Sequence, residues 1–449
     1  MRAVNAGLGA VEPRAPACFP FSAIDEAIHT LDAEPAPWSI QLEARVAGTF
    51  DEDRLRAAVQ QALIRHPMAH ARKVPASAFA RGWHWEIPSV LDLDPTRIVQ
   101  CGDDHALASA RGDLYSLSVP LAESPPVRVR VANHPGGDLI MLNVNHAAFD
   151  GFGSLRLLHS IARAYAGRPD PQAQVDVRKT RDVAALTEQP RSSHRLRRLR
   201  LVMEKLSDFV GAPARVAEQG RSERPGYGFH HVQLASEETE ALVSRRPPGS
   251  TVNDVLVAAL HVTVARWNEE RHVARRRIGV LVPTNLLPAN SRTQLVGNFS
   301  VPVRVVTRPR HHSSSRDVLE AVAAQTQKMK REETAAVMAD LLSTPARLPG
   351  WAKRGLPALL WLTGNRLVDT AILSNLGKVD EMPSFGPDAG ETVELWFSPP
   401  GRMPLGLAVG AVTAADKLHL VFRYRHALLD AAAAADFADL YLRSLTKLV

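Results

Sequence analysis

The 449-residue chain has few cysteines and no long apolar run, and each scarcity excludes a class of protein. Its two cysteines, Cys18 and Cys101, cannot build a disulfide framework and lack a metal-binding spacing, which favours a reducing compartment. No apolar run reaches the roughly 18 residues that a membrane-spanning helix needs. Residues 1–16 lack the apolar core of a secretory signal. We therefore expect a cytoplasmic protein.

Lysine is also scarce, since it supplies only 9 of the 54 cationic residues, and the formal net charge is +7. The arginine-rich segment 191–200 has two interpretations, a solvated helix face or an attraction for the phosphates of coenzyme A (CoA) or for an acidic carrier protein. It has no interleaved aromatic residues and no nucleic-acid-binding motif, so nucleic acid is not an expected partner. The chain also lacks the GxSxG, GxxxxGK[ST] and HExxH motifs.

Hydrophobic periodicity predicts several strands and helices in each half without strict βαβ alternation, which favours α/β sandwiches with mixed sheets. The predicted strands are 38–50, 126–133, 138–145, 230–236, 276–285, 298–306, 371–379, 393–400, 405–414 and 417–425. The predicted helices are 51–66, 153–167, 191–211, 250–270, 315–333 and 428–449. The polar, proline-containing segment 168–195 is predicted to link the two halves.

Two further patterns favour structural roles over ligand binding. Trp83 and Trp85 alternate around His84, which predicts a strand with an aromatic face turned to the core. The pairs His230-His231 and His311-His312 lack the spacing of metal ligands, so no metal site is expected.

Residues 143–158, NVNHAAFDGFGSLRLL, combine a histidine, an aspartate and two glycines where a predicted strand meets a predicted helix. An imidazole with a pKa near 6.5, held at a strand end, is suited to take a proton from an alcohol or an amine. Asp150 can fix the turn through a backbone hydrogen bond or an arginine pair. We expect Gly151 and Gly153 to supply positive φ where the chain reverses. By itself, however, an HxxxD spacing often arises by chance.

The wider sequence strengthens the interpretation, because the segment His146 to Gly151 resembles the HHxxxDG signature of the condensation-domain superfamily of acyltransferases. This superfamily includes condensation domains of nonribosomal peptide synthesis, wax ester synthases and polyketide-associated acyltransferases. Further segments resemble the family in the same order along nearly the whole chain. They are IQLEARVAGTFDEDRLRAAVQQALIRHP, STVNDVLVAAL, VPTNLLPANSRTQLVGNFSVPVRV and LSNLGKV.

The chain departs from the family pattern at two positions. The first histidine of the signature is Asn145 here, while His146 keeps the position of the catalytic histidine, and Asn145 can still hydrogen-bond the turn. Relatives often carry an arginine that pairs with the motif aspartate, and Leu287 takes the matching position. Asp150, which is mainly structural in the family, then needs another partner, either Arg292 or backbone groups alone.

The resemblance implies two lobes related to chloramphenicol acetyltransferase, arranged in a V with a tunnel between them. We predict an N-terminal lobe at 1–190, carrying the motif, and a C-terminal lobe at 191–449. His146 would act as general base and remove the proton of a hydroxyl or amine that attacks a thioester carbonyl. Candidates for holding the oxyanion are the Gly151 backbone N–H and the side chains of Asn298, Ser374 and Asn375, although the last three are equally consistent with ordinary strand-end or turn residues.

The resemblance implies no tightly bound cofactor, with acyl-CoA or the phosphopantetheine of an acyl carrier protein as donor substrate. The expected partners are a small alcohol or amine acceptor and an acyl or peptidyl carrier protein, and the chain is expected to be a monomer in a bacterial lipid, polyketide or secondary-metabolite pathway. Three alternatives stay open: a free-standing condensation enzyme with two carrier-bound substrates, a catalytically silent carrier-docking relative, and a thioesterase-like hydrolase.

Overall fold

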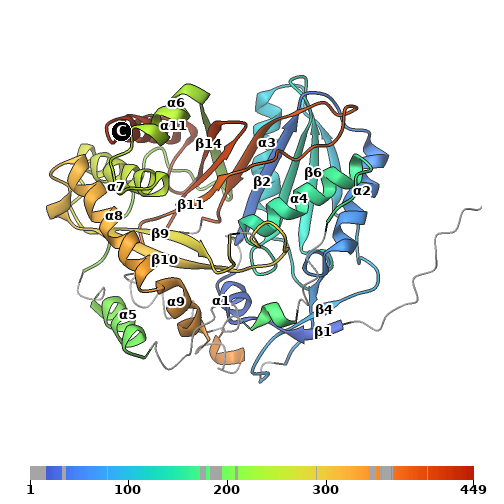
Figure 1. Ribbon diagram of the computed structural model, residues 1–449, viewed down its shortest axis with the longest axis horizontal. Helices are drawn as coiled ribbons and strands as arrows, with labels where there is room; N and C mark the ends of the chain where they lie inside the picture. Colours follow the sequence, from blue (N-terminus) through green and yellow to red (C-terminus); the bar gives the residue numbers. More distant parts are fainter. Residues whose placement is uncertain are drawn as a thin grey trace, which may run out of the picture.

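The computed structural model has a mixed α/β fold, in which two principal sheets lie side by side with helices on their outer faces (Figure 1). This confirms the predicted fold class. The structure describes residues 17–32, 37–77, 79–171, 178–182, 195–207, 211–289, 291–343, 350–353, 355, 366, 368–401 and 403–449. Within these residues, no helix is both long enough and apolar enough to cross a membrane.

The first principal sheet has five strands in the order β12-β2-β7-β6-β5. Its strands are β2 (Ser39–Val46), β5 (Thr96–Gln100), β6 (Val127–Asn133), β7 (Leu139–Asn145) and β12 (Thr392–Ser398). Helices α2 (Glu52–Arg65) and α4 (Gly151–Tyr165) pack together over one face, and α3 (Asp104–Ser116) packs on the other. The helix predicted at 51–66 is confirmed, and its buried residues form one apolar stripe, Leu55, Ala58, Val59, Ala62 and Leu63.

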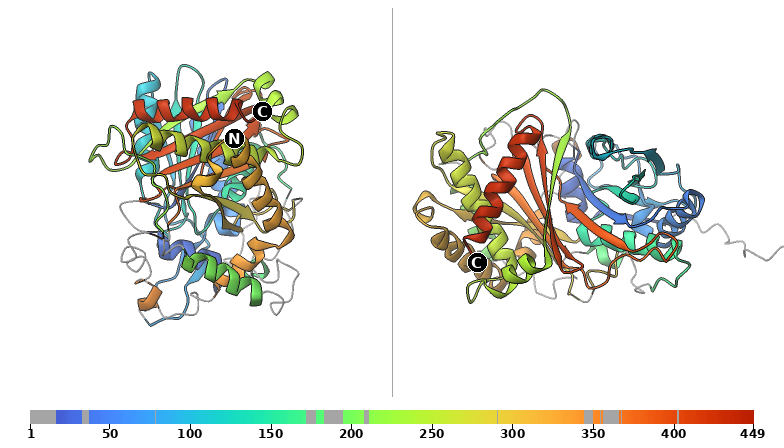
Figure 2. Two further views of the ribbon diagram at one scale, coloured as in Figure 1. Left: turned by 90° about the vertical axis from the view of Figure 1, so that its left-hand side faces the viewer. Right: turned by 90° about the horizontal axis from the view of Figure 1, so that it is seen from above.

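The second sheet has six strands in the order β10-β9-β11-β13-β14-β8. They are β8 (Tyr227–Leu234), β9 (Ile278–Asn285), β10 (Ser300–Thr307), β11 (Ala371–Lys378), β13 (Leu407–Ala414) and β14 (Lys417–Arg425). Helices α7 (Val252–Glu270), α8 (Ser315–Arg331) and α11 (Ala431–Thr446) cover its outer face (Figure 2). The smaller helices around this sheet are α5 (Arg195–Ser207), α6 (Ser236–Ser244) and α9 (Thr334–Leu342).

A small three-stranded sheet adjoins the first principal sheet. It contains β1 (Ala17–Pro20), β3 (Arg72–Lys73) and β4 (His84–Ile87), and α1 (Ala23–Leu31) follows β1. Trp85 is fully buried, stacks on Phe21 with 4.1 Å between ring centroids, and donates its indole N–H to Asp25. The prediction of a core-facing aromatic strand is therefore confirmed, whereas β1, α1, β3, β5, α3, α6 and α9 were not predicted.

The second half of the chain contributes one strand to the first sheet. Strand β12 pairs antiparallel with β2, and its backbone lies so close to β13 that a Cβ on Gly410 would be 1.9 Å from the Phe397 carbonyl oxygen. Gly410 therefore allows the two sheets to touch. The predicted boundary at 190/191 stays a prediction, because residues 183–194 lie outside the described ones.

The predicted linker contains a buried anchor. Arg181 is 6% exposed, and its guanidinium pairs with the buried carboxylate of Asp25 at 3.0 Å and lies over the Phe299 ring. Since an unpaired buried arginine would be costly, this contact ties segment 178–182 to α1. Segment 178–182 is therefore packed against the rest of the protein through Arg181.

Buried histidines make the stability of this fold sensitive to acid. Burial between α2 and α4 lowers the pKa of His66 from 6.5 to about 4, and its Nε2 lies 2.7 Å from the Ser160 hydroxyl. Arg65, Arg156 and His70 also lower this pKa, while Asp170 opposes the shift.

We predict that the free energy of unfolding is constant above pH 6.5 with respect to His66 and falls between pH 6.5 and about pH 4. In that window the unfolded chain binds the proton and the folded chain does not, and the shift corresponds to about 3 kcal/mol. Urea unfolding at several pH values should show a shallower pH dependence for His66→Gln than for the parent. His105→Gln, at an exposed position on α3, serves as the control, and equal slopes for all three proteins would contradict the prediction.

Candidate active site

The predicted motif forms the turn between β7 and α4. Strand β7 ends at Asn145, and the N–H groups of Ala148 and Phe149 both donate to the Asn145 carbonyl oxygen. Asp150 is the N-cap of α4 and accepts the Gly153 N–H at 2.8 Å. The helix thus begins two residues earlier than predicted, because the aspartate caps it at this point.

The prediction of positive φ at Gly151 and Gly153 is wrong, since neither residue has it and both lie in the first turn of α4. The glycines are needed for close packing instead. A Cβ on Gly151 would be 2.7 Å from Leu376 Cδ2, and a Cβ on Gly153 would be 2.7 Å from the Gly297 carbonyl oxygen. The start of α4 therefore touches segments from the second half of the chain directly.

His146 is half-buried at the strand end, and its ring orientation is fixed. Nδ1 lies 2.8 Å from the Phe149 carbonyl oxygen, which can only accept, so Nδ1 carries the hydrogen and Nε2 keeps its lone pair. Burial lowers the pKa of His146 below 6.5, and backbone hydrogen bonds offset part of this shift. The ring of Trp38 lies 6.3 Å away. The neutral imidazole can therefore accept a proton at Nε2 near neutral pH.

Asn145 holds the turn from inside. Its Oδ1 accepts the Ala147 N–H at 2.9 Å, and its Nδ2 donates to Asp32 and to the Val119 carbonyl. The Asn145 amide thus makes three hydrogen bonds, whereas the two ring nitrogens of a histidine could not replace all three. Asn145 therefore fixes the backbone of the turn on either side of His146.

Asp150 binds only neutral donors among the described residues. Its Oδ2 accepts from Asn285 Nδ2 at 2.8 Å, from the Phe299 N–H at 3.0 Å and from the Ser300 hydroxyl at 3.1 Å. Burial raises the pKa of this carboxyl, while the hydrogen bonds lower it. Three of these four donors, on Gly153, Asn285 and Phe299, are N–H groups that cannot accept, so the arrangement favours the ionised form.

The alternative partner Arg292 does not reach Asp150. Its Nε donates to the Leu287 carbonyl oxygen at 2.9 Å, and its guanidinium lies 6.0 Å from the centre of the Phe152 ring. Leu287 is 4% exposed. Asn285 and Ser300 were missed by the sequence reasoning, although each stands at a strand end within a segment that resembles the family.

The other candidates come from the second half of the chain. Asn298 is buried and donates its Nδ2 to the His146 carbonyl oxygen at 2.7 Å, so it joins the two halves at the turn. Ser374 is 8% exposed on β11 and shares a strand face with Leu376, which contacts Gly151. Asn375 points to the opposite face, and its Oδ1 accepts the Gly377 N–H at 2.8 Å.

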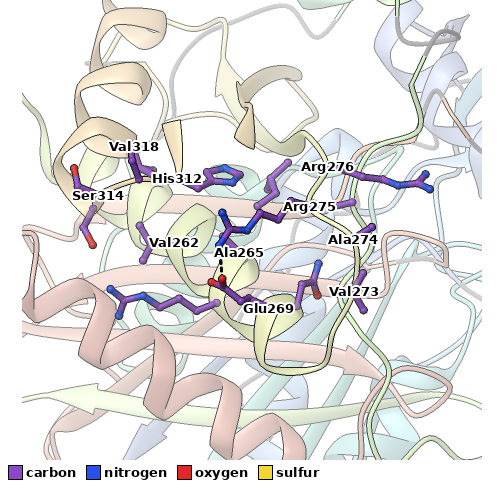
Figure 3. Close-up of a pocket in the computed structure, with 16 residues that line it drawn as sticks. Val262, Ala265, Glu269, Val273, Ala274, Arg275, Arg276, His312, Ser314 and Val318 are labelled. Atoms are coloured by element: carbon purple, nitrogen blue, oxygen red, sulfur yellow. Dashed lines mark hydrogen bonds and ion pairs between the residues drawn. The ribbon is translucent and has the colours of Figure 1, made fainter. Parts of the chain in front are cut away.

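A cavity of about 290 Å³ lies elsewhere, between the end of α7, the 273–276 segment and the start of α8 (Figure 3). Its lining includes His312 and the ion pair of Arg275 with Glu269 but no residue of the His146 turn. The described part of the chain holds no group of three or more His, Cys, Asp and Glu side chains arranged for a metal ion.

The fold is that of condensation-domain acyltransferases. The first condensation domain of the CDA synthetase superposes with a TM-score of 0.71 and 15% identity, covering 96% of both chains. The TRI3 trichothecene 15-O-acetyltransferase of Fusarium sporotrichioides also has a TM-score of 0.71, at 10% identity, covering 96% of this chain and 95% of that one. The starter condensation domain of rhizomide synthetase has a TM-score of 0.65 at 13% identity, covering 96% of this chain and 94% of that one.

Sequence comparison gives the family. The uncharacterized protein Rv2305 of Mycobacterium tuberculosis is 36% identical over 422 residues, which cover 94% of this chain and 97% of that protein. A linear gramicidin synthase polypeptide of Brevibacillus parabrevis is 24% identical over 433 residues, 92% of this chain but 5% of the synthase. No protein-family model matches the chain. The chain belongs to the same family as the mycobacterial protein, and it has the fold of condensation domains.

We predict that Gly153→Ala destabilises the protein by about 1–3 kcal/mol, because the new methyl group would press on the Gly297 backbone, which cannot rotate away. Chemical denaturation of purified variants would measure the loss. Gly102→Ala is the matched control, since a Cβ there meets nothing within 4 Å. Equal stabilities of the two variants would show that the contact between α4 and residue 297 is not tight in solution.

Proposed function

We propose that the protein is an acyltransferase in which His146 Nε2 is the general base. Nε2 takes the proton from a hydroxyl or amine as the oxygen or nitrogen attacks the carbonyl carbon of an acyl thioester. The tetrahedral intermediate then collapses, the carbon–sulfur bond breaks, and the imidazolium returns the proton to the thiolate. The products are an ester or amide and a free thiol, with no covalent enzyme intermediate.

The observation that carries this proposal is the single tautomer of His146. The Phe149 carbonyl holds the proton on Nδ1, so the lone pair of Nε2 is available, and burial keeps the ring neutral near pH 7. The similarity to a gramicidin synthase polypeptide and the fold shared with condensation domains and an acetyltransferase support a transferase over a histidine of purely structural role. Asp150, Asn298 and Asn145 would position the turn without touching the reactants.

For the oxyanion we favour the Gly151 N–H and the Ser374 hydroxyl. Gly151 is the first residue of α4, and the N–H groups of a first helical turn have no partner within the helix and favour negative charge. Ser374 lies on the strand face that reaches Gly151 through Leu376. Asn298 and Asn375 fit less well, because their amides already bind the His146 carbonyl and the Gly377 N–H.

The wider arrangement belongs to the same proposal. Lobes at 1–190 and 191–449 would form a V, with a tunnel that brings donor and acceptor to His146 from opposite ends. The donor would be acyl-CoA or a phosphopantetheine-bound acyl group of a carrier protein, and the protein would act as a cytoplasmic monomer. The condensation domain of rhizomide synthetase, whose structure was determined with C8-CoA and Leu-SNAC, supports a thioester donor by analogy of fold.

A catalytically silent carrier-docking relative is the second candidate, since Asn145 and Leu287 depart from the family pattern. The hydrogen bonds of Asn145 and the alternative donors of Asp150 weaken it, because the turn is fully supported without the missing side chains. A free-standing condensation enzyme and a hydrolase differ from the main proposal in the acceptor alone.

We predict that the parent protein transfers acyl groups from a panel of acyl-CoAs to alcohols or amines, and that His146→Ala lowers kcat/KM by about 10²–10⁴-fold. The acid limb of the kcat/KM profile should lie below pH 6.5, because burial lowers the pKa of His146. Mass spectrometry would identify the product, and His105→Ala, at an exposed position, is the control.

Other results of the same assay would favour one of the alternative functions. Binding of carrier protein without transfer by the parent would favour the silent relative. Release of free acid without an acceptor would favour the hydrolase. Full activity of His146→Ala would overturn the role of the base.

A further inference from the structure

A cavity of about 490 Å³ lies beside Asn285, a residue that supports the turn carrying His146 through its hydrogen bond to Asp150. It is open to the surface and is lined by β9 and β10 on one side and by α8 and the start of α9 on the other. Asn285, the last residue of β9, both lines this cavity and donates to Asp150 at 2.8 Å. The end of the cavity formed by Thr284 and Asn285 is therefore adjacent to the motif.

The walls of this cavity are mostly apolar. Side chains from the sheet and from α8 and α9 form them, namely Val282, Leu287, Val303, Val305, Met329, Ala335 and Ala336. Polar and charged side chains also line it, namely Asn253, Arg292, Thr326, Lys330 and Glu333, besides Thr284 and Asn285. The volume falls within the roughly 300–1,000 Å³ of small-ligand sites, and such a lining favours an aliphatic chain over a polar molecule.

Leu287 connects this cavity to the departure from the family pattern. The family resemblance described for the sequence implies an arginine at this position that would pair with the motif aspartate. Here Asn285 and Ser300 satisfy Asp150, so residue 287 is free to be apolar, and it lines the cavity as a leucine. An arginine at this position would place a charge and a longer side chain at the same wall.

We propose that this cavity takes the aliphatic chain of the acyl donor, and that the protein prefers medium-chain acyl groups to acetyl. This inference rests on the proposed function and names its substrate class. The chain would enter at Thr284 and Asn285 and extend between β9–β10 and α8–α9. Each methylene buried in the cavity would then strengthen binding of the acyl donor. Because one missing methylene in an apolar pocket lowers kcat/KM about tenfold or more, acetyl-CoA would be a much poorer donor than a medium-chain acyl-CoA.

The test fills the cavity from a helix that takes no part in the catalytic turn. Ala336→Phe places a ring at a half-buried position of the cavity wall. We expect the ratio of kcat/KM for decanoyl-CoA to that for acetyl-CoA to fall at least about tenfold. Ala324→Phe is the matched control, because Ala324 lines a different cavity at the start of α7 and the end of α11, and its ratio should equal that of the parent.

Leu287→Arg is a second variant that acts at the opposite wall, and it should lower the same ratio. Calorimetry with sodium decanoate gives a measurement that needs no turnover: the parent and Ala324→Phe should bind it, and Ala336→Phe should bind it at least about tenfold more weakly. Circular dichroism would confirm that each variant is folded.

The outcomes separate this inference from the proposed function. If the parent transfers acyl groups but Ala336→Phe keeps the parental chain-length ratio and decanoate affinity, the cavity is not the acyl site and the inference is overturned. If no thioester is turned over but decanoate binding depends on residue 336, the proposed function fails while the cavity still takes an aliphatic chain. Preference of the parent for acetyl-CoA would also overturn the inference.

Discussion

The buried carboxylate of Asp150 holds the candidate site together, because its donors come from both halves of the chain. The Gly153 N–H belongs to α4, whereas Asn285, Phe299 and Ser300 belong to the β9–β10 region. A carboxylate buried without these donors would cost several kcal/mol. The same interaction therefore starts the helix after His146 and joins that helix to the second sheet.

Close backbone packing makes this arrangement possible. Gly151 and Gly153 leave room for Leu376 and Gly297, and Gly410 leaves room for β12 against β13. The Asn298 amide then reaches the His146 carbonyl at 2.7 Å. The result is a histidine whose backbone is held from both halves, while its Nε2 has no hydrogen-bond partner among the described residues, as a general base would require.

The neutral donors of Asp150 have a consequence beyond the turn. An ion pair would have tied position 287 to the aspartate. With Asn285 in that role, Leu287 faces the cavity between β9–β10 and α8–α9 instead. Support of the motif and the lining of the neighbouring cavity are thus linked through Asn285, at the end of β9, and Leu287, two residues later. We infer that this link sets the preference for the acyl chain.

The sequence alone determined the mixed α/β class, most of the strands and helices, and the position of His146 at a strand end, because periodicity and the family motif are local signals. It did not determine the partner of Asp150, the true role of the two glycines, or the crossing of β12 into the first sheet. Those depend on which backbone segments meet, and residues such as Asn285 and Gly297 lie more than a hundred positions from the turn they support. Only the tertiary structure brings these segments into contact, since hydrogen bonding and steric exclusion act over a few ångströms in space and not along the chain.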